Sequence, residues 1–318
     1  MPFFSVIIPV YNKGPHIRRS ISSVLNQTFQ DFEVIVVNDA STDNSLEEIL
    51  KFHDPRIRLL HRDTPGPGGY AARNLGIREA KAEWAAFLDA DDEWNIEFLA
   101  KMRNLMLEFP QAQVLSSGWW LVEETGKKSA DDYYDRNKTS GNHIYNLKTY
   151  LSGPRPICMS VAVVKKKLLL RINGFDEKWN HGADTELWLR LMLNSTIGAW
   201  CPMIGAVYYQ DAVNRVGRSL TQELSLSVKS IQTFLKKNPH HHLRRKLRQY
   251  ANRQAIPPAL RCAIQNHMTL KYIKDNFYFE RNAISKLMFC FVVLAIDIIP
   301  RFIKKKLLAH LTRIQHTF

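Results

Sequence analysis

The segment Trp84-Ala-Ala-Phe-Leu-Asp89-Ala-Asp91-Asp92-Glu-Trp94 joins an apolar run to a cluster of acidic residues. Residues 84–88 are apolar and bounded by charge, which is typical of a buried strand. Three carboxylates, Asp89, Asp91 and Asp92, follow at the end of that strand. Carboxylates this close repel one another unless a cation or a donor-rich ligand holds them. Because open α/β sheets bind ligands beyond the carboxyl ends of their strands, the pattern predicts a ligand site here.

Oxygen ligands of this kind suit a hard divalent cation. Mg²⁺ or Mn²⁺ typically takes one or two carboxylates and leaves its other positions to water and phosphate. The alternative is a solvated acidic turn in which Asp91 or Asp92 caps the following helix. The cluster alone does not decide between the two.

The chain around this stretch alternates strands and helices. Apolar runs predict strands at 5–10, 32–37, 56–61 and 84–88, and helical spacing predicts helices at 17–26, 45–52 and 70–80. Ser45 and Glu48 have the spacing of a capping box at the start of the second helix. The alternation predicts an α/β fold with a mostly parallel central sheet flanked by helices.

Later residues are less regular. We expect strands at 114–122 and 159–164, a turn at 165–167 and a helix from Asp184. The four cysteines, at positions 158, 201, 262 and 290, lack metal-ligand spacing, so a reducing cytoplasm is expected. The chain enters its first strand at once, so no secretory leader is expected.

The net charge of +14 lies in the last third of the chain. Residues 221–318 contain 18 basic and 4 acidic side chains, whereas residues 1–220 contain 26 of each. The asymmetry predicts a neutral domain at 1–220 and a helical, basic region at 221–318. Basic appendages meet anionic surfaces.

Two segments near the C-terminus are candidates for membrane contact. Residues 287–299 are nearly all apolar but number 13, fewer than the ~20 of a spanning helix. Residues 301–314 alternate basic and apolar faces and suit a helix on an anionic membrane. A helix packed on the first domain is the alternative. The basic run 236–248 lacks a recognition motif, so nucleic acid is not an expected partner.

Four motifs occur in order along the first 220 residues: VIIPVYN at 6–12, VVNDASTDNS at 36–45, GGYAARNLGI with FLDADD at 68–92, and GFDE with HGADTELWLRL at 174–191. Together they resemble a family 2 glycosyltransferase with the GT-A fold, over about residues 3–220. No QxxRW motif follows the fourth, as in the non-processive members, of the bacterial cell-surface glycan type.

The resemblance implies a donor site. Pro9 and Tyr11 would shape a nucleotide pocket, and Asp39 would accept a hydrogen bond from the base, which favours uracil. The alternative for Asp39 is an Asx turn that stabilises Ser41. Arg73 would line the donor site near a diphosphate, or else stand as a surface arginine at an ordinary helix start.

The resemblance also implies a metal and a base. Asp89 would bind the ribose or sugar, and Asp91 would ligate the divalent ion (Mn²⁺ or Mg²⁺). Asp92 would belong to the same metal motif or cap the following helix. Asp184 matches the general base, with a plain N-cap as the alternative. Ala183 stands where the family usually has Glu, and Glu186 is a weak substitute for it.

Two arginines in a polar segment, Arg215 and Arg218, would contact the diphosphate from a closing loop, or belong to a solvated connection. The implied activity is inverting transfer of a hexosyl or N-acetylhexosaminyl group from a nucleotide-sugar to a glycan or lipid-linked acceptor. Asp39 favours a UDP-sugar as the donor. We therefore expect a cytoplasmic protein, free or peripheral on the inner face of the membrane. Alternatives are a sugar nucleotidyltransferase and a non-catalytic, membrane-associated sugar-nucleotide-binding protein. The donor sugar, acceptor, linkage and oligomeric state are not encoded in short motifs.

Overall fold

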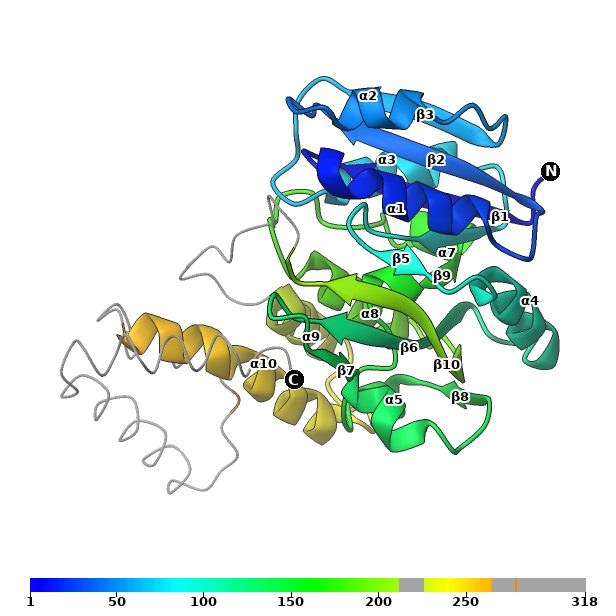
Figure 1. Ribbon diagram of the computed structural model, residues 1–318. Coiled ribbons are helices and arrows are strands. Elements are labelled where there is room, and N and C mark those ends of the chain that lie inside the picture. Colours follow the sequence, from blue (N-terminus) through cyan, green and yellow to red (C-terminus); the bar gives the residue numbers. More distant parts are fainter. Residues whose placement is uncertain (212–225, 265–277, 279–318) are drawn as a thin grey trace. The chain divides into compact units, whose positions relative to one another are not determined.

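The computed structural model of the protein describes residues 1–211, 226–264 and 278. The chain divides into two compact units, Met1–Arg218 and Ser219–Phe318. The first unit is a mixed α/β structure built on a central sheet (Figure 1). The described part of the second unit contains two helices.

A single sheet runs through the first unit and contains ten strands within the described residues. Their order is β3-β2-β1-β4-β9-β6-β10-β5, with β7 beside β6 and β8 beside β10. The strands are β1 Phe4–Val10, β2 Phe32–Asp39, β3 Ile57–Arg62, β4 Trp84–Phe87, β5 Glu93–Trp94, β6 Val114–Val122, β7 Lys128–Ala130, β8 His143–Tyr145, β9 Val163–Lys165 and β10 Gly198–Tyr209.

The N-terminal half of the sheet, β3-β2-β1-β4, is parallel, as the strand–helix alternation predicts. Every residue of β1 and β2 is buried, because helices cover both faces. Successive side chains of β2 point to opposite faces: Val34 and Val36 join the core under α1, whereas Ile35 and Val37 pack with Ala72 of α3.

The remaining part of the sheet is mixed. Strand β9 is antiparallel to both β4 and β6, while β10 is parallel to β6 and antiparallel to β5 and β8. The predicted α/β class is confirmed, with parallel pairing concentrated among the four N-terminal strands and in β6–β10.

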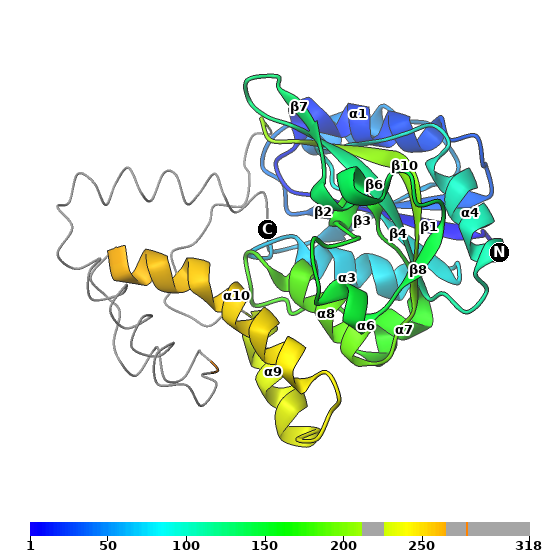
Figure 2. The same cartoon turned by 90° about the horizontal axis from the view of Figure 1, so that it is seen from below.

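The helices form a layer on each face of the sheet. Figure 2 shows α1 and α4 on one side and α3, α6, α7 and α8 on the other. The helices of this unit are α1 Gly14–Leu25, α2 Ser45–Leu50, α3 Tyr70–Glu79, α4 Phe98–Glu108, α5 Asp132–Asn137, α6 Leu147–Tyr150, η1 Met159–Val161 (3₁₀), α7 Lys166–Arg171 and α8 Ala183–Leu193.

Three local predictions are wrong. The strand expected at 159–164 is a 3₁₀ turn followed by β9, because pairing with β4 begins only at Val163. The turn expected at 165–167 instead starts α7, whose first residue, Lys166, donates its backbone N–H to the Glu83 carbonyl at 2.7 Å. The capping box also fails, because Asn44 is the N-cap of α2 and Ser45 is its first residue.

The second unit contains α9 Leu226–Lys237 and α10 Arg244–Ile264, which contact one another. Val228, Ile231 and Leu247 are buried, and the basic run 236–248 spans the end of one helix and the start of the other. Within the described residues, none of the helices has the length and apolar character needed to cross a membrane. Segments 287–299 and 301–314 lie outside the described residues.

Candidate active site

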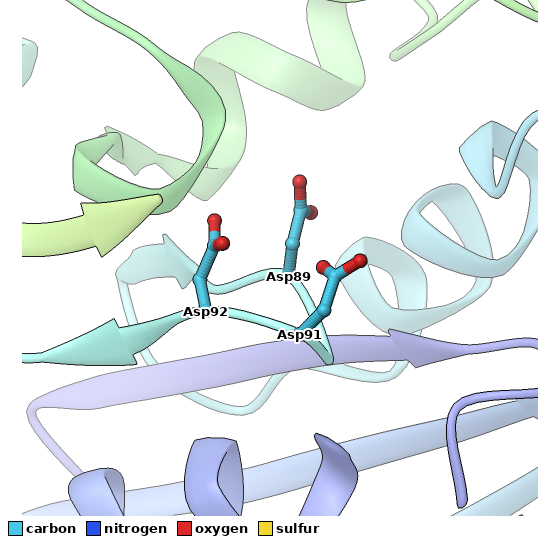
Figure 3. Close-up of side chains that lie close together, drawn as sticks. All are labelled: Asp89, Asp91 and Asp92. Carbon is cyan, nitrogen blue, oxygen red and sulfur yellow. The ribbon is translucent and has the colours of Figure 1, made fainter. Parts of the chain in front are cut away.

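Three carboxylates project from the turn between β4 and β5. Figure 3 shows Asp89, Asp91 and Asp92 extending from the same side of this turn. One oxygen from each lies within 4.8 Å of the others, a spacing that allows them to share one ion. The following helix, α4, begins at Phe98 with Glu97 as its N-cap, so the helix-capping alternative for Asp91 and Asp92 is wrong.

Each carboxylate has a different partner. Asp89 accepts a hydrogen bond from Arg73 Nη2 at 2.5 Å, and Asp91 Oδ2 lies 2.7 Å from Lys13 Nζ. Asp92 is fully buried and accepts from Ser160 Oγ at 2.5 Å and from the Tyr209 backbone N–H at 3.1 Å. Asp92 is thus fixed from two directions, whereas Asp89 and Asp91 are each held by one basic side chain.

The local electrostatics favour a bound cation. Burial raises the pKa of Asp92 well above its usual value, and the charges of Asp91 and Asp89 raise it further. Burial also raises the pKa of Asp89, despite the opposing guanidinium of Arg73. Carboxylates whose ionised forms are disfavoured in this way gain most from a divalent ion.

Arg73 is buried at the start of α3, which begins after the glycine-rich loop. Only 8% of the residue is exposed, so the surface-arginine alternative is wrong. Its Nη2 reaches Asp89, while its buried Nε has no hydrogen-bond partner among the described residues. The N-cap, Gly69, has φ +67° and a Cβ there would lie 3.2 Å from Arg73 Nη1, so glycine gives the guanidinium room.

The carboxyl ends of β1 and β2 place three predicted residues together. Pro9 is buried in β1, Tyr11 follows it with 39% of its surface exposed, and Asp39 ends β2 at 1% exposed. The Asp39 carboxylate accepts hydrogen bonds from Arg62 and, at 3.1 Å, from the Gly66 backbone N–H. The Asx-turn alternative is wrong, because Asn38 Oδ1 accepts the Ser41 N–H at 3.1 Å.

Asp184 is the second residue of α8. Gly182, with φ +80°, is the N-cap, so the plain N-cap alternative for Asp184 is wrong. Asp184 is partly exposed, and its negative charge contributes to raising the pKa of Tyr70, of Arg73 and of Asp89. The tertiary fold therefore joins the third and fourth motifs into one site.

Two neighbours of Asp184, Ala183 and Glu186, are both buried. Ala183 is fully buried. Glu186 is 4% exposed and binds Arg190 at 2.9 Å, so it is not a substitute at the site. Arg190 also donates to the Gly174 carbonyl at 2.7 Å, so its guanidinium joins α8 to the segment that precedes it.

Four contributors were not predicted as site residues: Lys13, Arg19, Ser160 and Tyr209. Arg19 donates to the Asp91 carbonyl and stacks 3.6 Å from the centre of the Tyr209 ring. For Lys13 the only signal in the sequence was its place between the first predicted strand and the first predicted helix, and that stretch is a poor match to a phosphate-binding loop. The other three carry no sequence signal. Arg215 and Arg218 lie outside the described residues.

Comparison with known proteins agrees with this architecture. The family model described as Glycosyl transferase family 2 matches residues 5–165. An uncharacterized glycosyltransferase of Rickettsia bellii is 36% identical over 199 residues, which are 61% of this chain and 27% of that protein. The UDP-Glc:alpha-D-GlcNAc-diphosphoundecaprenol beta-1,3-glucosyltransferase WfgD of Escherichia coli is 32% identical over 198 residues, which are 61% of this chain and 72% of that protein.

Among solved structures, S. aureus TarS 1-349 in complex with UDP-GlcNAc superimposes with a TM-score of 0.66 and 19% identity, over 79% of this chain and 72% of that one. The predicted GT-A fold is thereby confirmed. The chain spans about a quarter of the Rickettsia bellii relative and 40% of Escherichia coli YibD, to which it is 37% identical.

Proposed function

This chain belongs to glycosyl transferase family 2, and we propose that it is an inverting glycosyltransferase that moves a sugar from a UDP-sugar to a glycan or lipid-linked acceptor. The convergence of Asp89, Asp91, Arg73 and Asp184 at the carboxyl edge of the sheet is the observation that carries the proposal. The name of WfgD, which specifies a UDP-sugar donor and a diphosphoundecaprenol acceptor, supports the substrate classes.

The donor would bind across the ends of β1, β2 and β4. Tyr11 is exposed enough to lie against a base. Pro9, which is buried near the end of β1, limits the movement of the main chain that leads to Tyr11. Asp39, held by Arg62 and Gly66, retains acceptor capacity for the N3–H of uracil. Arg62 and Gly66 thereby orient the carboxylate before the nucleotide arrives.

The carboxylate cluster fits a divalent cation, because its oxygens are hard, close together and held on a rigid turn. Asp91 and one neighbouring carboxylate would hold Mn²⁺ or Mg²⁺, which supplies Lewis-acid stabilisation of the departing diphosphate. Arg73 orients Asp89 toward the ribose or sugar hydroxyls. Ser160 and Tyr209 keep Asp92 in place through two hydrogen bonds.

Asp184 would act as the general base. Its carboxylate takes the proton of the acceptor hydroxyl as that oxygen attacks the anomeric carbon from the face opposite the diphosphate. The bond from the anomeric carbon to the diphosphate oxygen breaks in the same displacement, which inverts the configuration. Asp184 lies on the first turn of a helix with a buried core face, so its backbone is held in position.

The basic region, 221–318, is the part we propose to meet an anionic membrane. All of the net positive charge lies there, and a lipid-linked acceptor would be presented at such a surface. Co-sedimentation with vesicles of anionic and neutral lipid tests this, since preferential binding to the anionic vesicles is expected. Equal binding to both would contradict it.

A donor-hydrolysis screen tests the catalytic proposal. Purified protein with Mn²⁺ is offered UDP-, GDP- and dTDP-sugars without acceptor, and release of nucleoside diphosphate is followed. EDTA-sensitive release from a UDP-sugar is the expected result. No release from any donor, together with no UDP binding by calorimetry, would overturn the proposal.

A further inference from the structure

The ion pair between Lys13 and Asp91 joins the first motif to the carboxylate cluster. Lys13 Nζ lies 2.7 Å from Asp91 Oδ2, and the two side chains are 13% and 15% exposed. Bulk water therefore screens this pair weakly. Asp91 is the carboxylate at which the proposed divalent cation would bind, and a lysine ammonium already pairs with one of its two oxygens.

The backbone around Lys13 is anchored independently of Asp91. The Lys13 N–H donates to Ser45 Oγ at 2.8 Å, and the Gly14 N–H donates to Asp43 Oδ2 at 3.0 Å. A Cβ on Gly14 would lie 1.9 Å from Asn44 Oδ1, so this turn packs tightly against the start of α2. The main chain is thus held while the ammonium sits at the end of a long side chain with several rotatable bonds.

The main chain of Asp91 is held by α1, the helix that begins directly after Lys13. Arg19, six residues after Lys13, donates to the Asp91 carbonyl oxygen. This contact is to the main chain of Asp91 and not to its carboxylate, so a cation on the carboxylate would not compete for the same atom. The contact that has to change when a divalent ion arrives is therefore the one from Lys13.

We propose that Lys13 is a built-in counter-ion for Asp91 that competes with the divalent cation for this carboxylate. The inference rests on the proposed function, because it takes the metal to bind at Asp91. A monocation and a divalent cation on the same carboxylate repel one another, so binding of the ion displaces the ammonium from Oδ2. Displacing Lys13 costs free energy, and this cost lowers the affinity of the cation for the site.

The displaced ammonium stays within reach of the site, because the main chain of Lys13 is anchored to α2. A diphosphate brought in with the cation offers it new anionic partners. Lys13 thereby disfavours cation binding alone and favours binding of the cation together with the nucleotide. Lys13 is in this sense a positioning residue that links metal affinity to donor binding.

The test is the affinity of the full chain for Mn²⁺, measured by calorimetry with and without UDP, in wild type and in Lys13→Met. Without UDP, the variant is expected to bind Mn²⁺ about 5- to 150-fold more tightly, the usual range of a coupling between two ligands. With UDP bound, the difference is expected to shrink. Lys13→Arg keeps the positive charge and is expected to retain wild-type affinity.

Lys51→Met is the matched control, since it removes a lysine from an exposed pair with Glu48, where the lysine side chain is 64% exposed. Lys13→Gln, which can still hydrogen-bond to Asp91, replaces Lys13→Met if circular dichroism shows that the latter is unfolded. Equal or weaker Mn²⁺ binding in the neutral variants overturns the inference, as does the absence of binding in wild type and variants alike. Binding in the variants alone supports it.

The two proposals fail in different ways. If wild type binds Mn²⁺ and UDP, Asp91→Asn abolishes Mn²⁺ binding and Lys13→Met binds as wild type does, the inference on Lys13 fails and the proposed function stands. If wild type binds neither UDP nor any UDP-sugar, the proposed function fails, whatever the Lys13 variants do with Mn²⁺.

Discussion

The side-chain amide of Asn74 pairs with both backbone polar groups of Phe175, 101 positions further along the chain. Asn74 Nδ2 donates to the Phe175 carbonyl at 2.9 Å, and the Phe175 N–H donates to Asn74 Oδ1 at 2.9 Å. Gly174, with φ +58°, brings the main chain so close that a Cβ there would lie 2.2 Å from Asn74 Oδ1. This pair of hydrogen bonds joins α3, which carries Arg73, to the segment that leads to Asp184.

Replacement of Asn74 by Ala is expected to destabilise the protein by about 2 to 4 kcal/mol, because two buried backbone groups lose their partner. The free energy of unfolding from urea titration measures the effect. Asn74→Asp keeps the acceptor but sets a buried carboxylate against the Phe175 carbonyl and the Glu177 carboxylate, and is expected to destabilise the protein at least as much as Asn74→Ala. If Asn74→Ala changes the free energy of unfolding by less than about 0.5 kcal/mol, water replaces these two hydrogen bonds in the variant.

Asp184→Asn is expected to lower kcat by about 10²- to 10⁴-fold, the usual contribution of a general base, and to leave the Kd for UDP unchanged. Steady-state rates with an acceptor and calorimetry with UDP measure the two quantities. Glu186→Gln is the control on the same helix. It disturbs the pair with Arg190, so it is expected to lower Tm and to leave kcat close to that of wild type. An Asp184→Asn variant with normal kcat would remove the base assignment.

Arg73 and Asp89 are expected to be strongly coupled in stability. Arg73→Met leaves a largely buried carboxylate unpaired and is expected to cost about 3 kcal/mol, whereas the double variant Arg73→Met/Asp89→Asn costs less than the sum of the single changes. Urea unfolding of the four proteins measures the coupling. The exposed pair Asp135–Lys138, with side chains 55% and 51% exposed, serves as the control and is expected to couple by under about 0.5 kcal/mol.

Asp131 is expected to make the protein less stable as the pH rises. Burial raises its pKa to about 6, although its carboxylate caps α5 and accepts N–H groups from Tyr134 and Trp119 at 2.9 Å each. Because the folded-state pKa exceeds the unfolded one, the native state binds more protons between about pH 4 and pH 6, and stability falls through that window.

The free energies of unfolding of wild type and Asp131→Asn, measured from pH 4 to pH 7, isolate this group. Whatever their offset at pH 4, wild type is expected to lose about 2 to 3 kcal/mol relative to the variant by pH 7. Asp135→Asn on the same helix controls for general charge effects. Parallel pH profiles for wild type and Asp131→Asn would show that Asp131 titrates normally.

The local sequence predicted those strands and helices that have a clear apolar pattern of their own. The uninterrupted apolar runs of β1 and β2 are recognisable because helices bury both faces of these strands. Strands such as β5 Glu93–Trp94 and β8 His143–Tyr145 have two or three residues and no periodicity of their own. They exist because β10 pairs with them, and such pairing is invisible in a local window.

The sequence was enough to place Asp89, Asp91 and Asp92 together, because they are neighbours in one turn after a buried strand. It also placed Asp39 and Tyr11 at strand ends, since parallel strands end at the same edge of a sheet. Only the folded chain pairs Lys13 with Asp91 and lets the charge of Asp184 act on Asp89. Residues 78 and 95 positions apart interact only when the sheet order is set, and that order depends on packing over the whole core rather than on any one motif.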